Sequence, residues 1–125
     1  MNLRLLAATL ILAGCAAVPP AAEPQRPAVE LAGRTPGAAQ RCVPINQSES
    51  LRVSETDRRM LIYGSGRTIW ANPLPPACGF RYDDVLVMEP FGSSYCRGDL
   101  VRSIDRTSHI PGPGCVLGDF IPYRR

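Results

Sequence analysis

Short runs of branched and aromatic residues, separated by Gly, Pro and Asp, recur along the chain beyond residue 42. No ten-residue window in this part repeats apolar residues at the 3.6-residue spacing of an amphipathic helix. Runs of this length and composition are typical of β-strands. The pattern predicts five or six short strands, at 50–54, 60–63, 68–71, 85–88, 99–104 and 115–121.

The segment MLIYGSGRTIWAN (60–72) contains the best hairpin of the chain. Two apolar runs flank Gly64-Ser65-Gly66-Arg67, and the glycines permit the positive φ values that a tight reversal needs. This hairpin would place Tyr63 opposite Trp70. By contrast, VLVM (85–88) is a continuous apolar run between two polar pairs, which predicts a strand buried on both faces.

These elements predict an all-β fold, a small compact barrel or rolled antiparallel sheet of five to six short strands. Closing or rolling the sheet would remove exposed strand edges. A domain starting at residue 42 has 84 residues, so its core is modest and covalent staples would stabilise it.

The first residues have the build of a secretory signal peptide. A basic tip ends at Arg4, and a nine-residue apolar core covers 5–13, which is too short to span a bilayer. Leu12-Ala13-Gly14-Cys15 resembles the lipobox of bacterial lipoproteins. The resemblance implies cleavage after residue 14 and a diacylglyceryl group on Cys15. Residue 16 is Ala rather than Asp, which by the same resemblance implies the periplasmic face of the outer membrane.

Residues 16–41 contain five prolines and no aromatic residue. Such a composition does not bury enough apolar surface to offset the entropy of ordering. The predicted organisation is therefore a signal peptide (1–14), a lipidated Cys15 with a disordered Pro/Ala-rich linker (15–41), and a small β domain (42–125).

Five cysteines are an odd number for an exported chain. Lipid on Cys15 would leave an even set that forms two disulfides in an oxidising compartment. The set comprises Cys42, Cys78, Cys96 and Cys115.

Three pairings of these four cysteines are conceivable. A hairpin of 99–104 with 116–121 would place Cys96 and Cys115 at opposite ends, too far apart for a bond. Cys78–Cys96 with Cys42–Cys115 is the favoured pairing, and Cys42–Cys96 with Cys78–Cys115 stays open.

The four-cysteine segment resembles an uncharacterised family of small exported bacterial proteins, a domain of unknown function. The resemblance covers 42–122 and rests on the cysteine spacing, on NPL after the hairpin, on C96-R-G-D and on C115-V-L-G-D-F-I-P. It implies no activity.

Catalytic and metal chemistry have little support in the sequence. The gaps between the four cysteines include no C-x-x-C pair, so we expect no metal and no cofactor. The only histidine, His109, lies in a Pro/Gly-rich stretch that predicts a solvated loop. Asp83, Asp84, Glu89 and Asp99 are the candidates for paired carboxylates, but turn and sheet-edge roles are favoured for them.

Charge and exposed aromatics complete the sequence evidence. All basic residues are Arg, and they alternate with acids, so no nucleic-acid partner is expected. Arg97-Gly98-Asp99 is interpreted as a turn next to a disulfide. Tyr63, Arg67 and Trp70 form a candidate binding spot, with core packing favoured for Trp70.

The hypothesis that follows is a lipid-anchored, non-enzymatic binding or structural module of the cell envelope. Its partners would be the membrane, through acylated Cys15, and an envelope protein or glycan. One alternative is an inhibitor of an envelope-attacking hydrolase such as lysozyme, for which YGSGRTIW (63–70) offers a vague similarity. Another is a peptidoglycan-acting enzyme that uses Asp or Glu.

Overall fold

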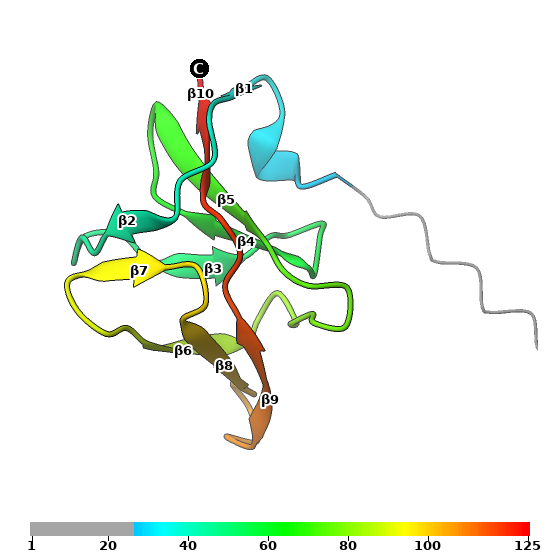
Figure 1. Cartoon of the computed structure of the whole chain (residues 1–125). Helices are drawn as coiled ribbons and strands as arrows, with labels where there is room; N and C mark the ends of the chain where they lie inside the picture. Colours follow the sequence, from blue (N-terminus) through cyan, green and yellow to red (C-terminus); the bar gives the residue numbers. More distant parts are fainter. Residues whose placement is uncertain (1–26) are drawn as a thin grey trace, which may run out of the picture.

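A computed structural model describes residues 27–125. The fold is all-β, as predicted, with three antiparallel sheets and no closed barrel in this range. Residues 27–125 form ten short strands instead of five or six. The two larger sheets lie at opposite ends of the domain, and a two-stranded ribbon lies beside them (Figure 1).

The largest sheet has the strand order β1-β10-β5-β4-β3. It contains β1 (Thr35–Pro36), β3 (Leu51–Val53), β4 (Met60–Tyr63), β5 (Thr68–Pro73) and β10 (Ile121–Arg124). The predicted hairpin is confirmed, because β4 pairs with β5 and Tyr63 lies opposite Trp70. Gly64 and Gly66 adopt the positive φ values, 86° and 78°, that the reversal requires.

The second sheet has the order β6-β8-β9, from β6 (Val85–Glu89), β8 (Leu100–Ile104) and β9 (Pro111–Val116). The predicted single strand 115–121 is wrong: β9 ends at Val116 and β10 begins at Ile121. Four residues of the stretch expected to be a loop, PGPG (111–114), belong to β9. This strand forms the sheet edge, where proline is tolerated because no neighbour needs its missing N–H.

The ribbon pairs β2 (Cys42–Pro44) with β7 (Ser94–Cys96). The favoured disulfide pairing is wrong, and the alternative is the one observed: Cys42–Cys96 and Cys78–Cys115. Cys42 lies directly opposite Cys96 in the ribbon. Cys115 lies on the edge strand β9 of the second sheet, opposite Val101 and near the open end of the β8–β9 hairpin.

The main core fills the space between the sheets. Every sheet contributes to it, and its largest fully buried side chains are Phe80 and Phe120. The other buried members are Val43, Val53, Leu61, Tyr63, Leu74, Val101, Cys115 and Leu117. Because these residues come from distant segments, no single hairpin of this domain holds an independent core.

A second, smaller core lies on the opposite face of β4 and β5. Ile62, Ile69 and Ala71 meet there, and Ala28 and Leu31 pack against them from the N-terminal side. Strand β4 is therefore buried on both faces. The strand predicted to be buried on both faces, β6, has an alternating pattern instead, with one face exposed.

The predicted linker extends too far along the chain. Residues 27–41 include a 3-10 turn, η1 (Val29–Leu31), and strand β1, which pairs with β10. Glu30 accepts hydrogen bonds from the Ser54 hydroxyl and the Glu55 amide at 2.7 and 2.9 Å. These contacts offset the entropy that the segment loses on ordering, although its composition predicted disorder. Residues 1–26, with the predicted signal peptide and Cys15, lie outside the described part.

Candidate functional site

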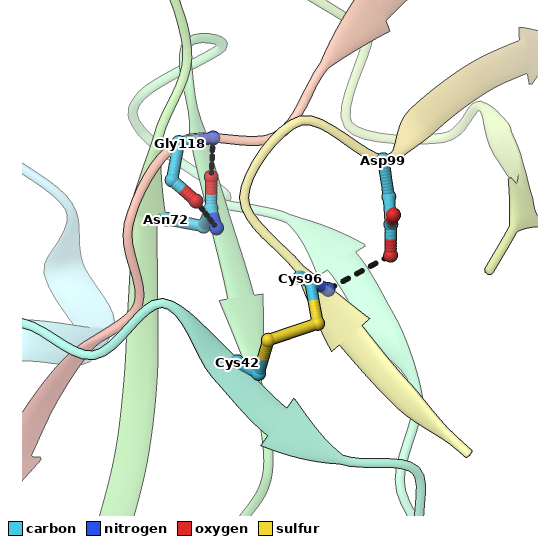
Figure 2. The surroundings of a disulfide bond; sticks show 5 residues. All are labelled: Cys42, Asn72, Cys96, Asp99 and Gly118. Carbon is cyan, nitrogen blue, oxygen red and sulfur yellow. Dashed lines mark hydrogen bonds between the residues drawn. A yellow bond between two sulfur atoms is a disulfide. The ribbon is translucent and has the colours of Figure 1, made fainter. Parts of the chain in front are cut away.

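The β2–β7 ribbon is held by a cross-strand disulfide. Figure 2 shows Cys42 and Cys96 joined across the two strands, with Asp99 beside them. The ladder continues one position beyond the strands, because the Arg97 amide donates to the Arg41 carbonyl at 2.8 Å. The register of this end of the ribbon is therefore fixed both covalently and by a backbone hydrogen bond.

The turn after β7 confirms the interpretation of Arg97-Gly98-Asp99 as a turn next to a disulfide. Gly98 has a φ of 90°, and the Asp99 carboxylate accepts the Cys96 amide at 2.8 Å. Asp99 is only 5% exposed. Its carboxylate stabilises the turn and is not presented to an external receptor.

A hollow of about 620 Å³ lies along β7, from the loop before Ser94 at one end of the ribbon to the turn after Cys96 at the other. Its volume is within the usual range of small-ligand sites, although it is open to solvent. Phe91 belongs to its lining and is 97% exposed. The whole lining comprises Arg41, Phe91, Gly92, Ser93, Ser94, Cys96, Arg97, Gly98 and Asp99.

The hollow contains two arginines, Arg41 directly before β2 and Arg97 directly after β7. Arg97 forms an exposed ion pair with Asp119 at 3.3 Å. Arg41 has no carboxylate within ion-pair distance among residues 27–125. Exposed ion pairs are weak, and Arg97 keeps further N–H donors for another acceptor. The hollow thus offers two guanidinium groups to an anionic ligand.

A second surface is the outer face of the β6–β8–β9 sheet. Val85, Val87 and Val116 point to this face and are 43%, 37% and 47% exposed. Arg102 and Glu89 form an exposed ion pair between them at 3.4 Å. Gly114 of β9, opposite Arg102 on this face, has no side chain to cover it. Within residues 27–125, this sheet therefore leaves an apolar face uncovered.

A third feature is the loop that connects β8 to β9. The Asp105 carboxylate accepts the Thr107 amide, the Ser108 amide and the Ser108 hydroxyl. These hydrogen bonds, those from Ser108 above all, lower the pKa of Asp105. His109 is an exposed loop residue, as predicted, with a φ of 58°.

Asp84 and Asp105 line a hollow of about 420 Å³ with Arg81. Arg81 pairs with Asp105 at 3.0 Å and with Asp83 at 3.5 Å. A glycosidase needs one carboxyl whose pKa is raised so that it acts as a general acid. The lowered pKa of Asp105 is the opposite of this requirement.

The predicted binding spot is divided between core and surface. Tyr63 is 4% exposed, and its hydroxyl donates to the Pro44 carbonyl and accepts the Asn46 amide. It is a core residue and does not form a contact surface. Trp70 packs partly buried against the main core. Arg67 is exposed, and its carbonyl accepts a hydrogen bond from the Arg34 guanidinium at 3.0 Å.

Sequence reasoning missed Phe91, Arg41 and the valine face. For Phe91 a signal was present, because the residue stands between Glu89-Pro90 and Gly92 in a segment typical of a turn. No comparable signal exists for Arg41, since its position opposite Arg97 depends on the disulfide register.

Residues 27–125 contain no group of three or more His, Cys, Asp or Glu side chains that would hold a metal ion. No helix within the same range is long and apolar enough to cross a membrane. No family model, curated protein or solved structure matches the chain. A function must therefore be argued from the surfaces described above.

Proposed function

We propose that the chain is a lipid-anchored, non-enzymatic binding module of the bacterial cell envelope, and that it binds a protein partner. The anchor would be Cys15, acylated after cleavage of residues 1–14, and the location would be the periplasmic face of the outer membrane. The observation that carries the binding role is the uncovered valine face of β6–β8–β9.

The sequence of β6 supports this role. VLVM is the composition of a strand that is covered on both sides, yet Val85 and Val87 are partly exposed within residues 27–125. A face with three exposed valines around a neutral Arg–Glu pair is suited to a protein surface with an apolar centre. The Cys78–Cys115 disulfide ties β9 of this face to the loop after β5, which lowers the entropy lost on binding.

The anchor is tested by acyl labelling. Cells grown with an alkyne fatty acid should incorporate the label into the wild-type chain and not into Cys15→Ser. Mass spectrometry of the purified protein should find an acylated N-terminal Cys15 after loss of residues 1–14. A labelled Cys15→Ser chain, or an unmodified Cys15 in the mature wild type, would contradict the anchor.

The binding face is tested by photo-crosslinking in intact cells. A photoreactive amino acid at Val116 should crosslink a distinct envelope protein. Val87→Glu should lower the yield about tenfold, because a charge then occupies the centre of the contact, while its position opposite Arg102 avoids like-charge repulsion. The unfolding midpoint should stay unchanged, since the Val87 side chain is partly solvated.

The matched control places the photoreactive group at Arg67, which is exposed on the β4–β5 turn of the other sheet. No crosslink at Val116 contradicts the proposed face. A crosslink at Arg67 alone contradicts it as well and favours the hydrolase-inhibitor alternative. Inhibition of a lysozyme panel by the purified mature chain would then identify that activity.

A further inference from the structure

Phe91 is the most exposed large apolar side chain among residues 27–125, at 97%. It lies in the loop between β6 and β7, preceded by Pro90 and followed by Gly92. By contrast, Val43 on β2, the strand paired with β7, is a core residue and only 1% exposed. The loop thus presents an aromatic tip away from the core, beside a rigid ribbon.

Arg41 and Arg97 lie at one end of the same ribbon, joined by the Arg97 amide and the Arg41 carbonyl. Like charges on opposite positions of paired strands destabilise the pair. The adjacent Cys42–Cys96 disulfide holds the two strands in this register despite the repulsion. Asp119 is within reach of Arg97, and the Asp99 carboxylate is engaged by the Cys96 amide. Arg41 has no such partner among residues 27–125.

We infer that the hollow along β7 docks on an anionic lipid surface, with Phe91, beyond the Pro44–Ser94 end of the ribbon, inserted at the interface, and Arg41 and Arg97, at the Cys42–Cys96 end, bound to lipid phosphates. The inference rests on the proposed envelope location. An apolar tip and cations that line one hollow are the combination by which interfacial proteins bind anionic membranes. Guanidinium groups also match the geometry of phosphate oxygens.

An acylated Cys15 would hold the domain close to the membrane surface. Residues 16–26 would span at most about 40 Å when fully extended, if Cys15 is held in the bilayer. The domain then samples the membrane surface at a high effective concentration, so a weak contact suffices to orient it. Docking through Phe91 would fix which surfaces of the domain face other envelope proteins.

The test uses the mature chain with Cys15→Ser, so that no acyl chain contributes to binding. Sedimentation with vesicles of equal parts phosphatidylglycerol and phosphatidylethanolamine should show binding at millimolar lipid. Vesicles of phosphatidylcholine alone should bind far less. Phe91→Ser should lower the partition coefficient about tenfold. Arg41→Gln should lower it about fivefold, the effect of one basic residue near an anionic surface.

The matched control is Tyr82→Ser, which removes another exposed aromatic, 60% exposed, at a position outside the lining of the hollow. It should bind vesicles like the parent. Phe91→Trp should retain binding, and its emission should shift to the blue on anionic vesicles only. Thermal unfolding midpoints that match the parent show that each variant is folded.

Three outcomes would overturn the inference: no binding to anionic vesicles, equal binding of Phe91→Ser and the parent, or equal loss in Tyr82→Ser. Saturable binding of inorganic phosphate without vesicle binding would identify a soluble phosphate ligand and overturn it too. An unmodified Cys15 in cells would contradict the anchor alone, because the vesicle measurement uses an unacylated chain.

Discussion

Replacing Cys78 and Cys115 together by Ala is expected to lower the free energy of unfolding by about 4 kcal/mol. The bond closes a loop with a sequence separation of 37 residues, so its loss enlarges the conformational freedom of the unfolded chain. It also joins the loop after β5 to β9 and so links the two larger sheets. For a domain of this size the melting temperature should fall by roughly 20 °C.

Thermal and urea unfolding, followed by circular dichroism, measure this loss. The comparison variant, Cys42→Ala with Cys96→Ala, opens a loop with a separation of 54 residues and should be destabilised by about 4 kcal/mol as well. Because Cys115 is 4% exposed and Cys42 is exposed, the first variant also loses core contacts and should be the less stable of the two.

The disulfide pairing is determined by peptide mapping under non-reducing conditions. Fragments that contain Cys42 with Cys96, and Cys78 with Cys115, are expected. Recovery of Cys78 linked to Cys96 would contradict the observed topology. Free thiols at these positions would contradict it too and would remove the staples on which the stability argument depends.

The β4–β5 hairpin was predictable because its information is local. Two glycines between apolar runs determine both the turn and the register that places Tyr63 opposite Trp70. The disulfide pairing was not predictable, since it depends on which strands meet. Strand β9 includes Pro111 and Pro113, and only its position at a sheet edge makes them acceptable.

The burial of β4 and β6 illustrates a further limit of prediction from the sequence. MLIY and VLVM are equally apolar runs, but β4 is covered on both faces and β6 on one. The cover over β4 comes from Ala28 and Leu31, in a segment whose composition suggested a linker. Composition reports the average tendency of a segment and does not reveal a few residues that fill a specific gap.

The candidate surfaces also divide into features with a local sequence signal and features that depend on the tertiary structure. Phe91 stands in a Pro–Gly context that predicts an exposed turn, so its exposure could be inferred from the sequence alone. The proximity of Arg41 to Arg97 requires the β2–β7 register, which joins segments 54 residues apart. The valine face depends on the strand order and register that bring Val85, Val87 and Val116 to one side of the sheet, which are tertiary information.

Asn72→Leu is expected to lower the free energy of unfolding by about 2–4 kcal/mol. Asn72 is fully buried in β5, and its side-chain amide bonds both polar groups of Gly118 (Figure 2). The Gly118 amide donates to Asn72 Oδ1 at 2.8 Å, and Asn72 Nδ2 donates to the Gly118 carbonyl at 2.9 Å. Leucine would leave both backbone groups without these partners next to an apolar core.

Asn72→Asp tests the two hydrogen bonds to Gly118 separately, because it keeps an acceptor for the amide and removes the donor to the carbonyl. At neutral pH its carboxylate accepts the Gly118 amide but faces the Gly118 carbonyl without a donor, so the variant is strongly destabilised. Burial and the facing carbonyl raise the pKa of this new carboxyl above that of the unfolded chain. The protonated form donates to the carbonyl, so the deficit relative to wild type should shrink as the pH falls through the raised pKa. Urea midpoints of both proteins from pH 7 downward measure this change, and a constant deficit would show that the Asn72–Gly118 pair does not join β5 to the segment between β9 and β10.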